Sequence, residues 1–584
     1  MKQSADLKRL LASIDHKSYP AYKDVRGAYD FNTYILSIDH VQGDPFASPS
    51  KVSVQIRHTK AGFPAELFDT PWKKTALEDY LLRCFSREIG RLSFKAKGSG
   101  KSGLIATSRP GQAVLSRTAC EIGKNEITAR FEVGFPAFGR TINSGELIRI
   151  FFDFLPGCVE SVFFYRRQNT AEIKKRITLA DDQQFIRNEL KRLDLVSFVA
   201  DGSILPRETG VSDRPMKGSV AFHSPDSLRI TLNLPGHGPI SGMAIRRGIT
   251  LIVGGGYHGK STLLKALESG VYNHIPGDGR EYVITDETAV KLRAEDGRSI
   301  NHVDISLFIR DLPNKKDTTC FSTADASGST SQAAAVIESI EAGTRAFLID
   351  EDTSATNFML RDDLMQRIVS RDKEPITPFI ERARDLYEQA GISTVLVAGS
   401  SGAYFFIADT IIQMDAYRPF DITEMVKNAC EQEVSKPAIQ APGFKLPTAG
   451  RKLAAGGTGR AVGAMALNFG DSRAEAGRNS DRNTRIKVRV HDKHSFQVAK
   501  EPVDLRFVEQ LADSEQTAAL AQMVRYCLEK GLLERCTVQE TVATLLKAYE
   551  TGGLSVFSDA SYAAMGLAMP RVQEIYACLN RFRG

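Results

Sequence analysis

The sequence predicts an α/β fold for the middle of the chain, flanked by a mixed α+β segment and by a largely helical one. Between about residues 215 and 430, short apolar runs typical of strands alternate with helical patterns. This alternation is typical of a largely parallel sheet whose strands are joined by helices. The run at 249–253 is followed directly by a glycine-rich loop and a helical segment, and further strands are expected at 346–349 and 394–397.

The first part of the chain, which we place at residues 1–213, mixes the two kinds of pattern. Residues 75–92 predict a helix, because four apolar side chains recur at intervals of four: Leu77, Leu81, Phe85 and Ile89. Apolar runs at 129–133 and 147–154 are typical of strands. We therefore expect an α+β domain that ends before the α/β core, which we place at residues 214–430.

The last part of the chain, residues 431–584, changes composition along its length. Residues 431–503 are rich in glycine, alanine and basic side chains, and they end in alternating basic and apolar residues that fit a strand. From Asp504 onward the pattern is helical, with a capping box at Thr537 and Glu540 and a helix stop at Gly552. We expect a C-terminal domain with a basic, glycine-rich segment and a helical end.

The composition is that of an ordinary globular protein and excludes several classes. Of the 584 residues, 42% are hydrophobic and 25% are charged, which excludes extensive disorder, a collagen-like build and a coiled coil. The N-terminus lacks the apolar core of a signal peptide, and the most apolar stretches are interrupted by charges. The eight cysteines form no CxxC pair, so we expect reduced cysteines, no structural zinc, no membrane association and a cytoplasmic location.

The segment 254–262 carries the sharpest chemical signal. It reads Gly-Gly-Gly-Tyr-His-Gly-Lys-Ser-Thr and satisfies the P-loop pattern between a strand and a helix. Glycines let successive backbone N–H groups point at phosphate oxygens, and the helix N-terminus adds positive potential. The pattern predicts an ATP site formed by nine residues: Gly254, Gly255, Gly256, Tyr257, His258, Gly259, Lys260, Ser261 and Thr262. Lys260 would reach the β- and γ-phosphates and Ser261 would ligate Mg²⁺; a glycine-rich turn that fits by chance is the alternative.

A second signal follows 90 residues after Lys260, where the apolar run 346–349 ends in Asp350 and Glu351. Carboxylates at the end of such a strand match the Walker B pattern, in which Asp350 lies beside the Mg²⁺ ion. Glu351 is then placed to polarise the attacking water as general base. An acidic strand end without chemistry is the alternative, and the separation from the P-loop favours the catalytic interpretation.

A third signal lies between the first two. Residues 326–332, Ala-Ser-Gly-Ser-Thr-Ser-Gln, precede an alanine-rich helical run and resemble the signature motif of ATP-binding-cassette (ABC) proteins. That resemblance implies that Ser327, Gly328 and Ser329 bind the γ-phosphate held by the opposite subunit, so that two copies close on ATP. Residues 350–357 resemble the cassette sequence DEPTSALD, whose last four residues form the D-loop at the dimer interface. A serine-rich loop with a helix cap is the alternative.

The chain also resembles a narrower family, the soluble ABC-class ATPases found in bacteria and in some protists. The resemblance rests on seven segments: HVQGDPFASPS (40–50), RPGQAVLSRTA (109–119), GGGYHGKSTLL (254–264), YNHIPGDGREYVIT (272–285), RAEDGR (293–298), ASGSTSQ (326–332) and IDEDTSATNFM (349–359). It implies an ABC nucleotide-binding core that uses ATP and Mg²⁺, family-specific N- and C-terminal domains, and no attached transporter. It also implies a link to RNA, because RNA binding is suggested for a protist relative.

Several positions depart from the usual ABC pattern. Ser329 replaces the second glycine of the common SGGQ form, and Thr356-Asn357 replaces Leu-Asp in the D-loop. The switch histidine that usually follows a late strand is absent, and Ser400 and Ser401 stand near that place. We therefore expect ATP hydrolysis that is slow. The alternative function is a nucleotide-gated clamp or assembly factor that acts on a protein partner with little hydrolysis.

Basic residues are concentrated in two regions outside the predicted core, although the net charge is only +6. Residues 83–101 carry six Lys and Arg against one acidic residue, and residues 443–500 carry twelve against four. Such segments fit contacts to a nucleic-acid backbone, with RNA favoured over DNA through the resemblance. A solvated linker is the alternative for residues 443–500, where aromatic residues are sparse and base stacking would be limited. The candidate contacts are Arg83, Arg87, Arg91, Lys95, Lys97, Lys101, Arg451, Lys452, Arg460, Arg485, Lys487 and Arg489.

Overall fold

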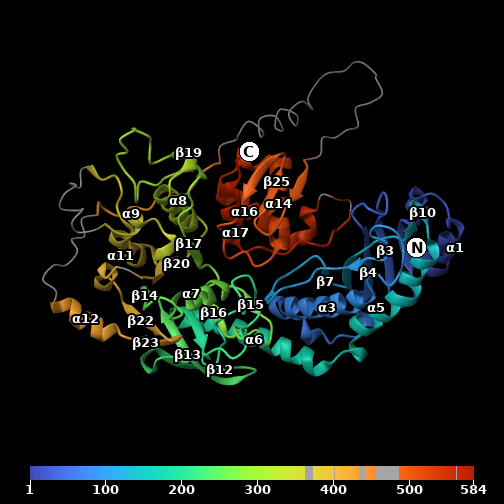
Figure 1. The fold of residues 1–584 in the computed structure, drawn as a ribbon, viewed down its shortest axis with the longest axis horizontal. Helices are drawn as coiled ribbons and strands as arrows, with labels where there is room; N and C mark the ends of the chain where they lie inside the picture. Colours follow the sequence, from blue (N-terminus) through green and yellow to red (C-terminus); the bar gives the residue numbers. More distant parts are fainter. Residues whose placement is uncertain are drawn as a thin grey trace, which may run out of the picture. The chain divides into compact units, whose positions relative to one another are not determined.

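The chain divides into two compact units (Figure 1). The computed structural model describes residues 1–361, 373–399, 401–432, 441–448, 450–453, 486–558, 560 and 562–583. The first unit consists of Met1–Asp182 with Gly552–Met569, and the second of Gln183–Thr551 with Pro570–Gly584. The three-part division predicted at residues 213 and 430 stays a prediction. None of the described helices combines the length and the apolar character that a membrane span requires.

The first unit contains a largely antiparallel sheet in the strand order β1-β2-β3-β4-β8-β5, with β7 also paired to β8. Its strands are β1 (Lys2–Gln3), β2 (Gly27–Asp30), β3 (Ile35–His40), β4 (Ser50–Arg57), β5 (Ile105–Ala106), β7 (Cys120–Ile122) and β8 (Glu126–Val133), and the unit also has the short strands β6 (Ala113–Val114), β9 (Ala137–Phe138) and β10 (Thr141–Ile142). Strand β8 alternates buried and half-buried residues, because one face of the sheet covers the core.

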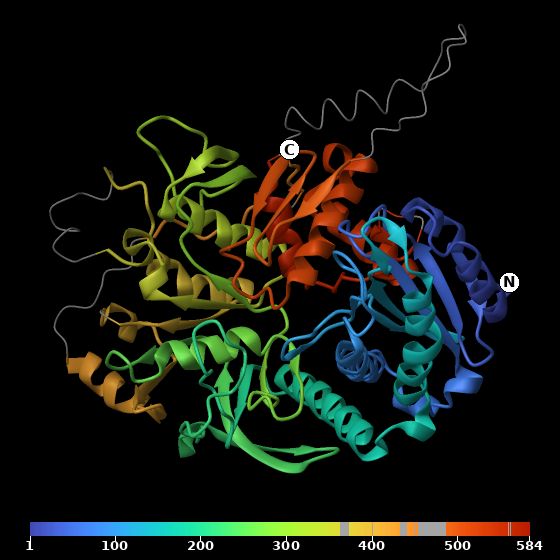
Figure 2. The ribbon, with the colours of Figure 1, turned by 45° about the vertical axis from the view of Figure 1, so that its right-hand side comes forward.

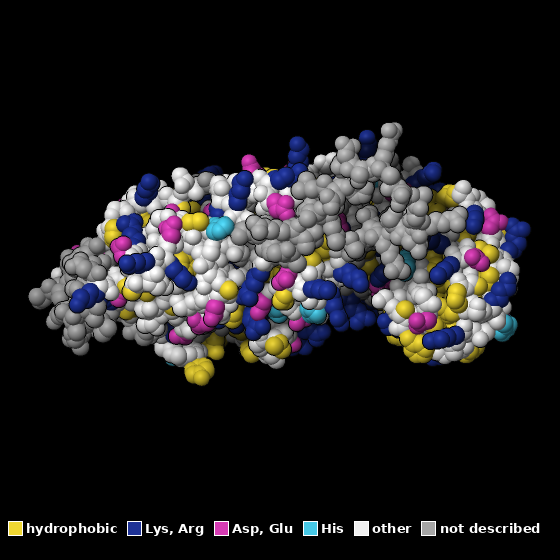
Figure 3. Space-filling model, turned by 90° about the horizontal axis from the view of Figure 1, so that it is seen from above, with side chains coloured by type: hydrophobic (Ala, Val, Ile, Leu, Met, Phe, Trp, Pro, Cys, Tyr) yellow, Lys and Arg dark blue, Asp and Glu magenta, His cyan; other side chains and the backbone are white. Residues whose placement is uncertain are grey.

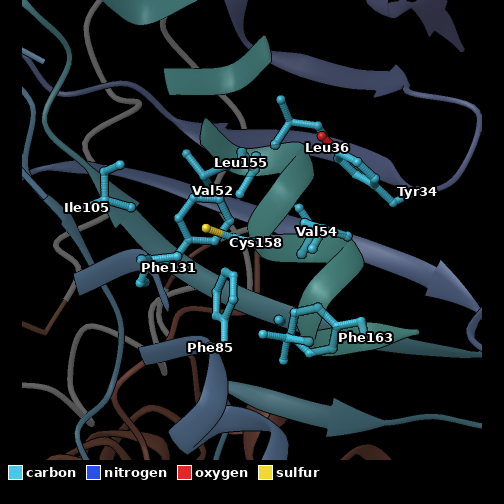
Figure 4. Packing of buried hydrophobic residues seen from close by; sticks show 14 of the residues in the cluster. Tyr34, Leu36, Val52, Val54, Phe85, Ile105, Phe131, Leu155, Cys158 and Phe163 are labelled. Atoms are coloured by element: carbon cyan, nitrogen blue, oxygen red, sulfur yellow. The ribbon is translucent and has the colours of Figure 1, made fainter. Parts of the chain in front are cut away.

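The helix predicted at 75–92 is confirmed as α3, which packs on this sheet. The helices of the unit are α1 (Ser4–Ser13), α2 (His58–Ala61), α3 (Pro71–Leu92), α4 (Ser144–Ile148) and α5 (Leu155–Phe163), and α6 (Thr170–Arg192) contains the residue at which the two units divide. Helix α3 begins at Pro71 because Thr70 accepts a capping hydrogen bond from the Lys73 N–H. Its buried Phe85 meets Phe131 of β8 and Phe163 of α5, at centroid distances of 5.5 and 5.2 Å (Figure 4).

The apolar run at 147–154 is helical, so the strand predicted there is wrong. Helix α4 continues through a π-helical turn, Arg149–Phe154, into α5. Leu147, Ile150 and Phe151 are all buried, and their spacing of three and four residues is that of a helix face. A short apolar run fits both a buried strand and a buried helix, so the composition of this segment did not separate the two.

The α/β fold predicted for the middle of the chain is confirmed in the second unit (Figure 2). Its six-stranded sheet has the order β17-β20-β21-β14-β22-β23, and every neighbouring pair is parallel except β22 with β23. The strands are β14 (Ile249–Val253), β17 (Val290–Leu292), β20 (Ala346–Asp350), β21 (Ser393–Val397), β22 (Thr410–Asp415) and β23 (Arg418–Asp421). The helices of this part are α7 (Lys260–Ser269), α8 (Gly328–Glu341), α9 (Thr356–Met359), α11 (Phe379–Ala390) and α12 (Thr423–Gln432).

Smaller sheets complete the second unit. An antiparallel sheet has the order β12-β13-β11-β16, and β18 pairs with β19. The strands are β11 (Leu195–Ala200), β12 (Arg229–Leu234), β13 (Gly238–Arg246), β15 (Asn273–His274), β16 (Val283–Thr285), β18 (Arg298–Val303) and β19 (Phe321–Ala326). Strand β11 precedes residue 213, yet it pairs with β13 and β16 of this unit.

The C-terminal part is largely helical, as predicted, and begins with a small sheet. Strands β24 (Val488–Val490), β25 (Ser495–Val498) and β26 (Glu501–Asp504) form an antiparallel sheet, so the basic stretch that fits one strand contains two. Helices α14 (Ser514–Glu529), α15 (Leu532–Arg535), α16 (Val538–Gly552) and α17 (Val572–Arg581) follow. The capping box is confirmed: the Thr537 N–H donates to Glu540 Oε2 at 2.8 Å and the Glu540 N–H to Thr537 Oγ1 at 3.2 Å.

Candidate functional site

The P-loop joins the carboxyl end of β14 to the first turn of α7. Two of its glycines are required by the space around them. Gly254 has φ +135° and a Cβ there would lie 2.3 Å from the Met414 carbonyl, and Gly259 has φ +100°. Lys260, the first residue of α7, donates from Nζ to the carbonyls of Gly254 and Gly255 at 2.7 and 2.9 Å. The ammonium group therefore lies in the mouth of the loop, where a phosphate would be received.

The turn between β22 and β23 braces the P-loop. The Ala416 N–H donates to Nδ1 of His258 and the Tyr417 N–H to the His258 carbonyl, both at 3.0 Å. Ala416 and Tyr417 have φ of +46° and +66°, a left-handed conformation that L-residues rarely adopt. The Tyr417 ring lies against Gly259, since a Cβ on that glycine would be 2.8 Å from the ring. Tyr257, at the tip of the loop, is 99% exposed with φ +64°.

The Walker B carboxylate lies at the same sheet edge as the P-loop. Val397 at the end of β21 pairs with Ile252 of β14 on one side and with Asp350 of β20 on the other. These three residues form one row across three parallel strands, so Asp350 lies about 10 Å from the β14 chain, two strand spacings away. Parallel strands place their ligands beyond the carboxyl ends. The row therefore places Asp350 and the P-loop at the same edge of the sheet.

The side chain of Glu351 is hydrogen-bonded to the backbone just after β21, the strand that lies between β14 and β20. Its Oε2 accepts a hydrogen bond of 2.6 Å from the Gly399 N–H. Burial and then the charge of Glu351 raise the pKa of the neighbouring Tyr404 phenol, which donates to the Met359 carbonyl at 2.7 Å. Gly399 stands near the place of the usual switch histidine; Ser401 caps the following turn through Oγ, and Ser400 lies outside the described residues.

The signature residues lie at the exposed start of α8. Ser327 is the N-cap residue and is exposed, and its Oγ lies 3.0 Å from Thr330 Oγ1. A Cβ on Gly328 would lie 3.3 Å from Asp296 Oδ1 and 3.5 Å from Ala355. The neighbours of this motif therefore come from the loop 293–298 and from the D-loop.

Two departures from the ABC pattern contact each other. Ser329 Oγ donates to Asn357 Oδ1 at 2.7 Å. The signature glutamine, Gln332, adds two bonds: its Nε2 donates to Ser354 Oγ at 3.0 Å, and its Oε1 accepts the Ala355 N–H at 2.9 Å. The signature helix and the D-loop are thus joined by three side-chain hydrogen bonds within one chain.

We expect the Ser329–Asn357 contact to appear as coupling between two substitutions. Ser329→Ala and Asn357→Ala should each lower the thermal unfolding temperature by about 1–3 °C, because one partly buried hydrogen bond contributes about 1 kcal/mol. The double variant should lose no more than the larger single variant. Scanning calorimetry or fluorescence melting measures this. Ser329→Ala combined with Thr356→Ala is the control pair, whose losses should add; additive losses for Ser329 and Asn357 would contradict the coupling.

The signature helix is also tied to the C-terminal helix by buried ion pairs. Arg298 pairs with Glu338 of α8, and Arg581 of α17 donates from Nε to Glu295 Oε2 at 3.2 Å. Burial raises the pKa of Glu295, but Arg581 and Arg298 outweigh this and hold the pKa below its ordinary value. The Glu295 N–H donates to Ser331 Oγ of α8 at 2.9 Å. The loop 293–298 therefore connects the signature motif to the C-terminal helix, a role that its family-like sequence did not reveal.

Of the predicted nucleic-acid contacts in the first unit, the arginines contact other side chains of the chain, whereas the lysines are exposed. Arg83 donates to both carboxylate oxygens of Asp79, at 2.6 and 3.0 Å, and its side chain is 18% exposed. Arg87 lies 3.3 Å from Cys84 Sγ and Arg91 pairs with Glu88 at 3.0 Å. Three lysines are exposed: Lys95, Lys97 and Lys101.

Those of the second unit also fall into two groups. The side chain of Arg451 is only 6% exposed, and its Nη2 lies 2.7 Å from Glu341 Oε2, so the guanidinium group is paired with the signature helix α8. Lys452, Lys487 and Arg489 are exposed, whereas Arg460 and Arg485 lie outside the described residues. Figure 3 shows Lys and Arg side chains spread over the face seen from above, with acidic side chains between them.

Among the described residues, no three or more His, Cys, Asp or Glu side chains form a group that could hold a metal ion. The oxygen donors at the sheet edge are Asp350, which is 8% exposed, and the exposed hydroxyl of Ser261. Oxygen ligands of this type are those that Mg²⁺ prefers.

Comparisons with known proteins agree with this geometry. A family model for an ABC-class ATPase P-loop domain matches residues 169–445, a model described as the ATPase of the ABC class N-terminal domain matches 4–166, and one described as the MRB1590 C-terminal domain matches 487–584. The uncharacterized protein MJ1628 of Methanocaldococcus jannaschii is 31% identical over 229 residues, which are 38% of this chain and 50% of that protein. The chain thus spans half the length of this relative.

Two solved structures resemble the chain over part of its length. CbiO1 of Clostridium perfringens, described as part of the ABC transporter complex cbiONQ, has 13% sequence identity, covers 41% of this chain and 92% of its own, and gives a TM-score of 0.26. The ADP conformation of MJ1267, an ATP-binding cassette of an ABC transporter, has 11% identity, covers 41% and 95%, and gives 0.25. Because the three family models together match almost the whole sequence, the chain belongs to the ABC-class ATPases in which the P-loop domain is flanked by this N-terminal and this C-terminal domain.

Proposed function

We propose that the chain binds ATP with Mg²⁺ and hydrolyses it, and that ATP-driven closure of two copies acts on nucleic acid, with RNA favoured over DNA. The observation that supports this most directly is the row Ile252–Val397–Asp350, which aligns the P-loop strand and the Walker B strand at one edge. A phosphate chain in the P-loop would then lie between Lys260 and Asp350, within reach of Glu351.

The residues at this edge fit a nucleotide and its metal ion. The Lys260 ammonium would exchange the carbonyls of Gly254 and Gly255 for phosphate oxygens, which are stronger acceptors because they are charged. Ser261 and Asp350 supply the oxygen atoms for Mg²⁺, which when bound offsets the charge of the phosphates. Glu351, oriented by the Gly399 N–H, is the group that would take the proton of the attacking water.

A second copy would complete the site. Ser327 is exposed at the N-terminus of α8, and the atoms nearest to Gly328 come from the loop 293–298 and from the D-loop of its own chain. The N-terminus of α8 carries positive potential that suits the γ-phosphate of a nucleotide bound by the partner copy. Tyr257 at the tip of the P-loop is nearly fully exposed, and aromatic side chains of this kind anchor protein interfaces.

The nucleic-acid part is tested by retention of a labelled single-stranded RNA on filters across a salt series, with and without ATP. We expect binding whose logarithm falls linearly with the logarithm of the salt concentration, by about 0.7 for each phosphate contacted. The exposed lysines Lys95, Lys97, Lys101, Lys452 and Lys487 supply the charge. Absence of retained RNA at every salt concentration, with and without ATP, would remove nucleic acid from the proposal.

The alternative, a nucleotide-gated clamp for a protein partner with little hydrolysis, is favoured by the switch position. A backbone N–H, that of Gly399, contacts Glu351 there, and it cannot change its charge as a histidine would. Measurement of phosphate release separates the two functions.

A further inference from the structure

The glycine-rich loop at 94–103 of the first unit is folded tightly onto two other segments. The Ser99 N–H donates to the Ala137 carbonyl at 2.7 Å and the Lys101 N–H to the Pro45 carbonyl at 2.8 Å. Gly100 has φ +61°, and a Cβ there would lie 2.6 Å from the Pro45 carbonyl, so this close approach requires glycine. The backbone thus holds the loop 94–103 in fixed contact with residues 44–46 and 137–139.

Each of the three joined segments exposes a phenylalanine. Phe46 is 64% exposed, Phe94 53% and Phe138 62%. Phe46 lies against the loop, since a Cβ on Gly100 would be 2.9 Å from its ring. Phe94 has φ +62°, which is unfavourable for a side chain of this size. Single exposed apolar residues are ordinary, but three large rings on adjoining segments indicate a binding surface.

The same loop also carries lysines. Lys95, Lys97 and Lys101 are exposed on the loop itself. Two nearby carboxylates accept hydrogen bonds from backbone N–H groups. Asp44 Oδ1 accepts from Phe46 and Ala47 at 2.8 and 3.1 Å. Glu146 Oε2 accepts from Lys97 at 3.0 Å. We call the following six residues the Phe–Lys surface: Phe46, Phe94, Phe138, Lys95, Lys97 and Lys101.

We infer that the Phe–Lys surface binds a single strand of nucleic acid, with bases stacked on the phenylalanine rings and phosphates contacted by the lysines. Proteins that bind single strands without sequence preference combine these two features. A duplex keeps its bases stacked inside and offers the rings nothing to stack on. A protein partner fits less well, because lysine is depleted in the cores of protein interfaces. This inference rests on the proposed action on nucleic acid and assigns it a surface.

The test compares full-length variants with a fluorescently labelled single-stranded RNA of mixed sequence. The double variant Phe46→Ala, Phe138→Ala should bind at least about tenfold more weakly with an unchanged salt slope, because stacking does not release counterions. The triple variant Lys95→Ala, Lys97→Ala, Lys101→Ala should lower the slope by about 2, at about 0.7 for each lost contact on a single strand. These slopes distinguish the two kinds of contact.

Control variants show whether a loss of RNA affinity comes from the rings of the Phe–Lys surface. Phe420→Ala removes an exposed ring outside this surface, 48% exposed in β23, and should leave RNA affinity unchanged. The pair Phe46→Leu, Phe138→Leu removes the rings while keeping apolar volume, and it should also weaken binding, with melting temperatures as the folding control. If the wild type binds no RNA, the proposed function itself is wrong. Suppose that the wild type binds RNA and that the alanine pair and the leucine pair both bind it as tightly as the wild type. The Phe–Lys surface is then not the single-strand site. The same conclusion follows if both pairs lose affinity for a double-stranded RNA as much as for the single strand, or if they change only the oligomeric state.

Discussion

A Glu351→Gln variant should lose ATP turnover by about 10²- to 10⁴-fold, which is the range that a general base contributes. ATP affinity should remain within a few-fold of the wild type, because the substitution removes the charge of Glu351 but keeps its size, and the proposed role of Glu351 is to accept a proton. The glutamine keeps an oxygen that can accept the Gly399 N–H, so the local structure should persist. Steady-state phosphate release and nucleotide-binding titrations measure the two quantities.

In the proposed cycle turnover opens the dimer, so the same variant should remain closed as a dimer after binding ATP. Size-exclusion chromatography with light scattering, with ATP and with ADP, would show this as an ATP-dependent doubling of mass. Asp352→Asn is the matched control: it removes a carboxylate one residue away that is exposed, and it should retain turnover within a few-fold. Normal turnover in Glu351→Gln would show that another group activates the water.

The positions of the P-loop and of Asp350 can be predicted from the sequence, whereas the contacts between the motifs cannot. The P-loop and Asp350 are each recognisable because a few residue types at fixed spacing follow an apolar run. Their common edge then follows from the parallel sheet, although the order that places β21 between β14 and β20 is a tertiary feature. Ser329 and Asn357 were both visible as departures from the ABC pattern, but no local pattern relates two positions 28 residues apart; only the fold shows that they share a hydrogen bond.

The incorrect and missing predictions have physical causes of the same kind. The composition of the run at 147–154 predicts a strand, although the segment is helical, because buried helices and buried strands have similar compositions. Arg451 is among the predicted nucleic-acid contacts, yet its side chain is buried against Glu341, because charge alone does not reveal a partner 110 residues away. Phe46 and Phe138 are far apart in sequence, and only the contacts of residues 44–46 and 137–139 with the loop 94–103 bring both segments next to this loop.

Lys260→Ala should reduce ATP affinity by about 10- to 100-fold and abolish phosphate release. A hydrogen bond between charged groups contributes about 1.5–3 kcal/mol, and this substitution removes the cation that would contact the β- and γ-phosphates. The P-loop itself should keep its conformation. The substitution removes the two hydrogen bonds of Lys260, but the backbone N–H groups of the turn after β22 still donate to His258 of the loop. Isothermal titration with ATP and a coupled phosphate assay measure the two effects.

Phosphate release by the wild type, measured against Lys260→Ala, separates the two proposed functions. Lys265→Ala is the matched control, since Lys265 is an exposed lysine of the same helix and its loss should change neither affinity nor turnover. If the wild type binds ATP but releases no more phosphate than Lys260→Ala, hydrolysis is contradicted and the nucleotide-gated clamp is supported. The contact of Gly399 with Glu351 favours that outcome. A backbone N–H can orient Glu351, but it cannot gain or lose a charge as a histidine side chain does. The site would then lack the switching step that a histidine provides, and its rate of hydrolysis would depend on closure of the dimer.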